Sequence, residues 1–288
     1  MIWKKILRRL AAMAATLLVA GLLAATLVRF APGFDADERE LDPQLSPQSR
    51  QALEQARAGE HNILTFYFSY LRNAVHGELG TSRALDQPVT SLLRDRWAVT
   101  AKLVALGLAL AWILALGLAL SAALVRWPPY EILGVTVSGA ALCIPAAVLA
   151  LLSVVLRVPG EAVIACIIFP KIHRYARNLI GKTYAQPHIT SARSRGVGEI
   201  RILLWHVLPV IGPQLAALAG ISVGLAVGAT VPVESLLGLA GLGQLAWKAA
   251  LARDLPLLLN LTLVITLVTL LANSTGDLIA EAFRSNEA

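Results

Sequence analysis

Charged residues are scarce in this 288-residue chain, because Asp, Glu, Lys and Arg together make up only 15% of it. A soluble domain of ordinary composition carries about 25%. Hydrophobic residues make up 57%, and they gather in runs near the ~20 residues that cross a bilayer. Soluble cores rarely need so many apolar residues in a row, so run length excludes the soluble class.

Cysteine is nearly missing too. The two that exist, Cys143 and Cys166, lie inside apolar runs, and the sequence has no Cys-x-x-Cys or Cys/His cluster. This excludes a disulfide framework and a clustered metal site. We expect both to be small buried hydrophobic side chains, with no metal and no cofactor.

A phosphate loop of the form Gly-x-x-x-x-Gly-Lys-Ser/Thr does not occur, and the glycine-rich "GLAGLGQ" has no Lys in place. Such a loop is what holds the phosphates of ATP in many ATPases. We therefore predict that the chain is not itself an enzyme and has no catalytic residues. The net charge of +7 does not indicate nucleic acid, because a Lys/Arg excess is typical of the cytoplasmic loops of membrane proteins.

The apolar runs predict an all-α integral membrane protein with six transmembrane helices. The predicted spans are Leu10–Val28, Val99–Val125, Ile132–Leu156, about Ala162–Ile180, about Val210–Pro232 and Leu255–Ala280. The fourth is the weakest, because Pro170 and the three basic residues Lys171, Arg174 and Arg177 interrupt it. We expect part of it to be covered by protein.

Charge placement predicts the orientation. Residues 1–9 hold four basic residues and no acid, and the loop at about 171–209 holds seven basic residues against the single acid Glu199. Basic loops stay in the cytoplasm, so we expect both termini and this loop to be cytoplasmic, in a multi-pass protein.

Two regions are expected. Residues 1–97 comprise the first span and an outer helical segment, in which Ser46-Pro47 is a helix-start signal and the aromatic run Phe66–Leu71 suits the membrane interface or packing onto the helices. Residues 98–288 form a five-span core with the basic loop between spans four and five.

The stretch "SARSRGVGEIRILLWHVLP" (Ser191–Pro209) is basic and amphipathic. Val197, Ile200, Leu204 and Val207 recur at three- and four-residue steps and are predicted to share one helix face. Two interpretations are open: a helix lying on anionic lipid, or a helix docking into a groove of a soluble partner.

This stretch resembles the cytoplasmic loop of permease subunits of binding-protein-dependent ABC importers, whose pattern is Glu-Ala-Ala, three residues, Gly, nine residues, Ile, one residue, Leu-Pro. Gly196 and Leu208-Pro209 match it at the right separation. Thr190, Ser191 and Ala192 replace Glu-Ala-Ala, and His206 replaces the Ile. The form without the Glu is similar to the dipeptide/oligopeptide/nickel branch.

Four further segments resemble that branch, in order along the chain. They are "GELGTS" (Gly77–Ser82), "CIPAAV" (Cys143–Val148), "VESLLGLAGLGQLAWKAALARDLPLL" (Val233–Leu258) and "GDLIAEAF" (Gly276–Phe283). Ala240 stands where the branch has the Pro of Pro-Gly-Leu-Gly, and Leu255 where it has the Tyr of Arg-Asp-Tyr-Pro.

The resemblance implies a bacterial inner-membrane permease subunit for a small solute, most simply a di- or oligopeptide, with a nickel chelate or another solute as the alternative. It implies a second permease subunit (a heterodimer), two ATP-binding subunits and an extracytoplasmic substrate-binding protein as partners. The loop would carry the motion of the ATPases to the spans. The residues expected to couple to the ATPase are Ala192, Arg193, Arg195, Gly196, Ile200 and Leu204.

Small polar residues within the spans are candidates for the translocation path, although such residues also hold helices together. The candidates of this kind are Ser138, Ser222, Thr230 and Asn260, and the acid Glu234, at the outer end of the fifth predicted span, is a further candidate. For Glu234 the structural alternative is a cap on the following helix or an ion pair with Lys248 or Arg253.

Two rival classes predict other features. A stand-alone secondary transporter would carry charges at mid-span, and these are nearly missing. An intramembrane enzyme would need a Ser/His pair, but all five histidines are predicted to lie in loops.

Overall fold

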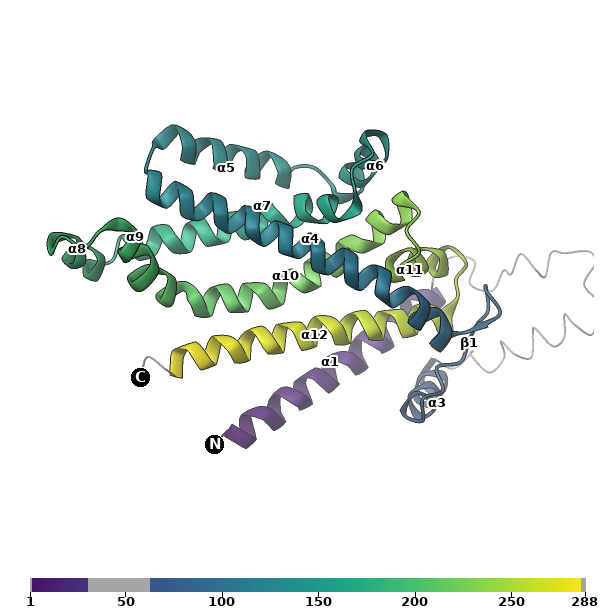
Figure 1. Cartoon of the computed structure of the whole chain (residues 1–288). Coiled ribbons are helices and arrows are strands. Elements are labelled where there is room, and N and C mark those ends of the chain that lie inside the picture. The colour runs from purple at the N-terminus through teal and green to yellow at the C-terminus, as the bar shows by residue number, and fades with distance from the viewer. Residues whose placement is uncertain (1, 31–62, 286–288) are drawn as a thin grey trace, which may run out of the picture. The chain divides into compact units, whose positions relative to one another are not determined.

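The computed structural model describes residues 2–30 and 63–285, most of them in helices (Figure 1). The chain divides into two compact units: Met1–Arg96 with Leu245–Leu267, and Trp97–Gln244 with Val268–Ala288. Three helices contribute residues to both: α4 (Val89–Val125), α11 (Leu242–Leu251) and α12 (Leu255–Ser285). The predicted division at residues 97 and 98 stays a prediction.

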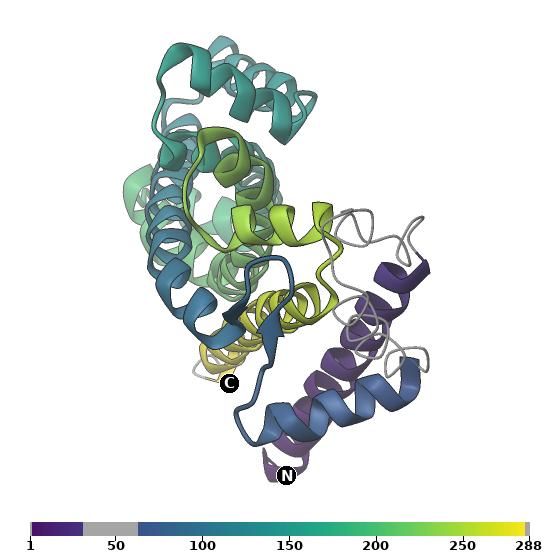
Figure 2. The same ribbon diagram turned by 90° about the vertical axis from the view of Figure 1, so that its right-hand side faces the viewer.

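The first unit also contains α1 (Ile2–Phe30), α3 (Ile63–Val75) and a two-stranded hairpin of β1 (Thr81–Ser82) and β2 (Gln87–Pro88). Helix α3 lies across α1 (Figure 2), and the Tyr67 hydroxyl donates to the Leu18 carbonyl over 2.8 Å. Tyr67 and Tyr70 are buried, so part of the predicted aromatic run packs onto the helices. The helix predicted after Ser46-Pro47 lies outside the described residues.

The second unit is built around α7 (Gly160–Tyr184), which packs against α5 (Pro128–Leu142), α6 (Ala146–Leu156) and α10 (Leu208–Leu237). Between α7 and α10 the chain forms α8 (Pro187–Ser194), α9 (Glu199–Ile202) and the π-turn η2 (Leu203–Val207). These short elements lie at one end of α7 and α10 (Figure 1).

The predicted third span is two helices rather than one. Helices α5 and α6 meet at 98° across the break at residues 143–145. Pro145 has no N–H to donate and disfavours a helical residue before it, which is why α5 ends and α6 begins here. The two helices pass the test for a membrane span only when they are taken together, so the third span over Ile132–Leu156 stays a prediction.

Four described helices are long and apolar enough to cross a membrane, and the bent α5–α6 pair makes up to five. They include predicted spans one, two, five and six. Helix α7, the predicted fourth span, is not among them, and many of its residues, such as Ile164, Ile168 and Ile172, are instead buried inside the protein. The count of six spans stays a prediction.

Helix α10 and the second half of α12 approach closely at glycines. A Cβ on Gly220 would come within 2.6 Å of the Ala272 carbonyl oxygen, and one on Gly276 within 2.7 Å of the Ala216 carbonyl oxygen. Only small residues allow two helix backbones to come this near.

Cys143 and Cys166 are both free and both exposed, so the expectation that they are buried is wrong. An apolar run in a membrane protein faces either lipid or protein, because lipid tails are as apolar as a protein core.

Candidate functional site: the α8–α9 loop and the buried polar clusters

One face of α8 is held by the core of the second unit. Ile189 and Ala192 are buried in a cluster with Ala176, Ile202 and Val207, residues of α7, α9 and η2. Ala192, a predicted coupling residue, is therefore only 2% exposed. Ala192 thus anchors α8 to the core of this unit.

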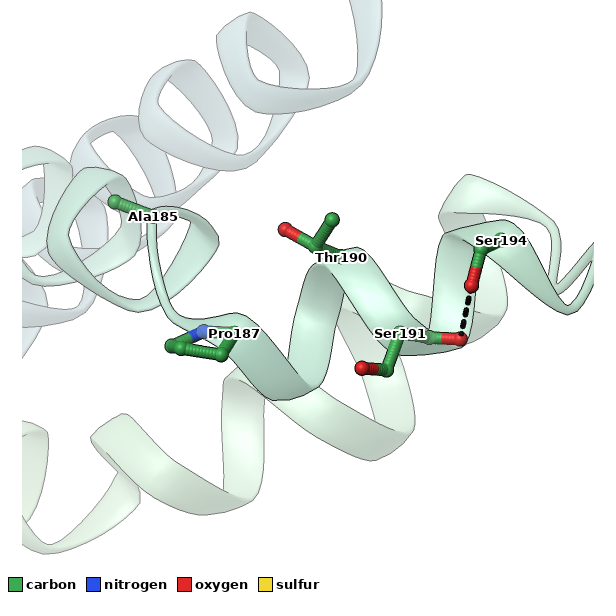
Figure 3. A pocket seen from close by; sticks show the side chains of 5 residues that line it. All are labelled: Ala185, Pro187, Thr190, Ser191 and Ser194. Atoms are coloured by element: carbon green, nitrogen blue, oxygen red, sulfur yellow. Dashed lines mark hydrogen bonds between the residues drawn. The ribbon is translucent and has the colours of Figure 1, made fainter.

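The other face of α8 is open and carries hydroxyl groups. Ala185, Pro187, Thr190, Ser191 and Ser194 line a hollow of about 440 Å³ (Figure 3). The Ser194 hydroxyl donates to the Ser191 carbonyl over 3.0 Å. Thr190 and Ser191 occupy the first two positions of the family's Glu-Ala-Ala, so a short polar surface replaces the acid there.

Gly196 ends α8 with a backbone φ of +79°. Val197 N–H donates to the Ala192 carbonyl and Gly196 N–H to that of Arg193, a closure that needs a residue in the left-handed region. Glycine adopts this conformation without steric cost. The match to the family's Gly thus has a local physical reason.

Arg193, which is predicted to couple to the ATPase, forms an ion pair within the chain. Arg193 Nε donates to Glu199 over 2.8 Å, and Arg126 Nη2 donates to the same carboxylate over 2.9 Å. The Arg126 guanidinium also lies over the Tyr184 ring, 5.4 Å from its centre. Glu199 therefore joins α8 and α9 to the end of α4. Arg195 Nε donates to the Ser191 carbonyl.

The predicted apolar face of this loop is wrong. Val207 is fully buried, but Ile200 is 65% exposed and Leu204 is 51% exposed. Two departures from a regular helix cause the difference: the turn at Arg195–Gly198, and the π-turn, which adds a residue to the turn. Ile202, Leu203 and Val207 face the core instead.

Glu234 is the centre of a buried polar cluster in the second unit. One of its oxygens accepts from the Thr100 hydroxyl at 2.7 Å, and the other accepts from Gly243 N–H at 2.7 Å and Gln244 N–H at 3.1 Å. Its carboxylate therefore caps α11, as the structural alternative predicted. Leu242 N–H in turn donates to the Thr100 hydroxyl.

Sequence reasoning missed Thr100 and Gly241 in this cluster. A Cβ on Gly241 would fall on the Glu234 carboxylate, so this glycine of "GLAGLGQ" makes room for an acid. Thr230, one turn before Glu234, packs against Gly243 and donates its hydroxyl to the Val227 carbonyl.

The remaining path candidates lie in separate clusters. Ser222 accepts from Trp112 Nε1 at 3.1 Å, and Ser138 lies 3.1 Å from His173 Nδ1. In the first unit, Asn260 accepts from the Tyr70 hydroxyl and donates to the Leu79 carbonyl. Burial, and then the neighbouring Tyr67, raise the pKa of Tyr70 to about 12, so its hydroxyl keeps the proton that it donates.

Asp254, which sequence reasoning also missed, joins two of the family-like segments. It accepts from the Ser82 hydroxyl at 2.5 Å and Ala84 N–H at 3.0 Å, and its other oxygen accepts from Leu257 N–H. Ser82 ends "GELGTS", and Asp254 belongs to "ARDLP". Ser82 and Asp254 both lie within segments that resemble the importer branch, and this resemblance was the sequence signal that could have identified them.

The expectation that all histidines lie in loops is wrong for His173, which is buried in α7 beside Ser138. The Ser138 hydroxyl donates to the Val135 carbonyl, and no acid bonds to His173 in the described residues. Ser222 has the Gly-x-Ser-x-Gly spacing of serine hydrolases, whose serine occupies a strand-to-helix turn. Here it lies mid-helix in α10, so neither serine has the geometry of a nucleophile.

Comparison with known proteins finds a family match and similar permeases. Residues 107–286 match the family described as "Binding-protein-dependent transport system inner membrane component". The oligopeptide transport system permease protein OppB of Escherichia coli (strain K12) is 31% identical, over 91% of this chain and 92% of its own. The protein of the same name from Salmonella typhimurium (strain LT2) shows the same identity and coverage.

Proposed function

Because the chain belongs to the family of binding-protein-dependent transport system inner membrane components, we propose that it carries di- or oligopeptides across the bacterial inner membrane. It is a multi-pass permease subunit of an ABC importer, a class that works with ATP-binding subunits and a substrate-binding protein. The observation that supports a peptide cargo is the 31% identity to the oligopeptide permease OppB over 91% of the chain.

Peptide transport is tested in proteoliposomes that hold this chain, a second permease subunit and two ATP-binding subunits, with the binding protein outside. A radiolabelled tripeptide should accumulate with ATP inside and not with ADP. Accumulation of a nickel chelate without any peptide uptake would contradict the cargo and leave the importer class standing.

The partner surface that the geometry favours is the hydroxyl-lined face of α8. Thr190, Ser191 and Ser194 are exposed there, whereas Ala192 is buried and Arg193 is engaged by Glu199. A small, open, polar hollow admits a side chain of an ATP-binding subunit. Glu199, through Arg126, would then pass its motion to α4 by rigid-body movement.

Ser191→Trp fills this hollow without touching the buried face of α8. We expect it to abolish co-purification of the ATP-binding subunits with tagged permease, while the yield of folded permease stays normal. Ile200→Trp is the matched control, because Ile200 is 65% exposed on α9 and does not line the hollow. Normal assembly of the Ser191 variant would contradict this docking face.

A further inference from the structure

The segment Glu199–Val207 is apolar on two opposite faces, and only one of them is covered by the chain. Ile202, Leu203 and Val207 are buried in the core. On the other side Ile200 is 65% exposed, Leu204 51% and Trp205 73%, and Arg201 is exposed beside them. We call these four residues the Trp205 ridge.

The π-turn shapes this ridge. Ile202 and Val207, five residues apart, both face the core, which is the spacing of a π-helix. The extra residue leaves Leu204 and Trp205 adjacent on the outside. Ile200 and Leu204, four residues apart, continue the same stripe, and Pro209 and Val210 extend it along α10.

The ridge runs without a break into a membrane-spanning helix, since Glu199–Leu237 form one candidate span. Trp205 lies five residues before Val210, the predicted start of the hydrocarbon region, or about 7 Å at ~1.5 Å per residue. The headgroup layer on each side of a bilayer is roughly 5–8 Å thick. Trp205 therefore falls at headgroup depth, where tryptophan is enriched.

The charge of the ridge suits the same environment. Arg201 makes no ion pair with any described residue, so its guanidinium is available to a phosphate. The acid nearest to Arg201 in the sequence, Glu199, is held by Arg193 and Arg126. Trp127, 60% exposed, directly follows Arg126 at the end of α4, which places a second tryptophan near this end of the unit.

From these observations we infer that the Trp205 ridge is a lipid anchor: Ile200, Leu204 and Trp205 insert at the headgroup–acyl boundary of the inner leaflet, and Arg201 binds the phosphate of an anionic phospholipid. The anchor holds the segment between α8 and α10 at a constant depth in the membrane. A displacement of α8 by the ATP-binding subunits then rotates α10 instead of sliding α9 along the membrane surface. Ile200 and Leu204 thereby move from the predicted ATPase contact to a lipid contact.

Depth-dependent quenching tests the insertion of Trp205. The full chain and its Trp205→Phe variant are reconstituted in vesicles of phosphatidylethanolamine and phosphatidylglycerol whose chains are brominated near the headgroup or near their ends. The difference in fluorescence between the two proteins is the emission of Trp205. We expect bromine atoms near the headgroup to quench this emission more strongly than bromine atoms near the chain ends. Quenching by aqueous iodide alone, or loss of lipid quenching once the ATP-binding subunits are bound, would overturn the inference.

The role of Arg201 is tested by native mass spectrometry of the full chain with phosphatidylglycerol. Arg201→Gln should lower the apparent affinity about fivefold, the effect of one basic residue at an anionic surface. Arg195→Gln is the matched control, because Arg195 is bonded to the Ser191 carbonyl on the α8 side. Equal losses in both variants, or none in Arg201→Gln, would overturn the phosphate contact.

Discussion

At the scale of single residues, the five polar side chains predicted to line the translocation path are occupied by contacts within the chain. Glu234 accepts three hydrogen bonds from Thr100, Gly243 and Gln244, and Ser138, Ser222 and Asn260 each have a side-chain partner. Groups satisfied in this way stabilise the helix arrangement before any of them meets a solute. Whether they also line the translocation path stays a prediction.

Replacing Glu234 by Gln should lower the free energy of unfolding by about 1–3 kcal/mol, the cost of leaving a buried polar group unsatisfied. The new amide N–H₂ cannot accept a hydrogen bond, so it would face either Thr100 or two backbone N–H groups. Thermal unfolding of the purified chain in detergent measures the change. Glu131→Gln removes the exposed ion pair to Arg177 and should cost no more than about 1 kcal/mol; equal losses would contradict the buried cluster.

At the scale of helices, close backbone approach and one ionic junction do most of the positioning in the second unit. Gly220 and Gly276 let α10 and α12 touch. Glu199 joins α8 and α9 to α4 through two arginines. The contact between α10 and α12 is apolar and rigid, whereas the ion pairs of Glu199 are exposed and weak.

Gly220→Ala should destabilise the chain by about 1–3 kcal/mol, because its Cβ meets backbone atoms of Ala272 and Asn273 that cannot rotate away. Gly228→Ala, on an exposed side of the same helix with nothing within 4 Å, should be neutral or stabilise by up to ~1 kcal/mol. Thermal unfolding of the two variants side by side makes the comparison. Indistinguishable midpoints would show that α10 and α12 do not meet at Gly220.

Glu199→Gln should leave stability within about 1 kcal/mol of the parent, since both of its ion pairs are exposed. It should nevertheless uncouple transport from ATP hydrolysis, because α8 loses its ionic tie to α4. The ratio of peptide taken up to ATP hydrolysed in proteoliposomes measures coupling. A control is Glu131→Gln, which breaks a similar exposed pair elsewhere; an unchanged ratio for Glu199→Gln would argue against the junction.

At the scale of the whole molecule, the distribution of basic residues fixes the proposed orientation, with α8 and both termini in the cytoplasm. In a Cys143→Ser, Cys166→Ser background, a cysteine at Glu78 should react with a membrane-impermeant maleimide in intact cells. A cysteine at Ser194 should react only after the membrane is opened. Both positions are exposed, so burial cannot explain a difference. Labelling of the cysteine at position 194 in intact cells would show that α8 lies outside, which contradicts the proposed orientation.

The sequence alone determined the class of the protein, the positions of most apolar helices and the likeness to importer permeases. These properties depend on run length, charge sign and short motifs, which are local along the chain. The break at Pro145 and the turn at Gly196 could also be expected, because proline and glycine restrict or free the backbone of their own position.

Only the tertiary structure decided which apolar face meets protein. Lipid and a protein interior are both apolar, so periodicity could not separate Ile202 and Val207 from Ile200 and Leu204, nor predict that both cysteines are exposed. Periodicity also could not show that Arg193 would donate a hydrogen bond to Glu199. It could not show either that Ser82 would donate one to Asp254, which lies 172 residues away. Such pairings depend on how the packed helices bring distant segments together, and no short stretch of sequence specifies that.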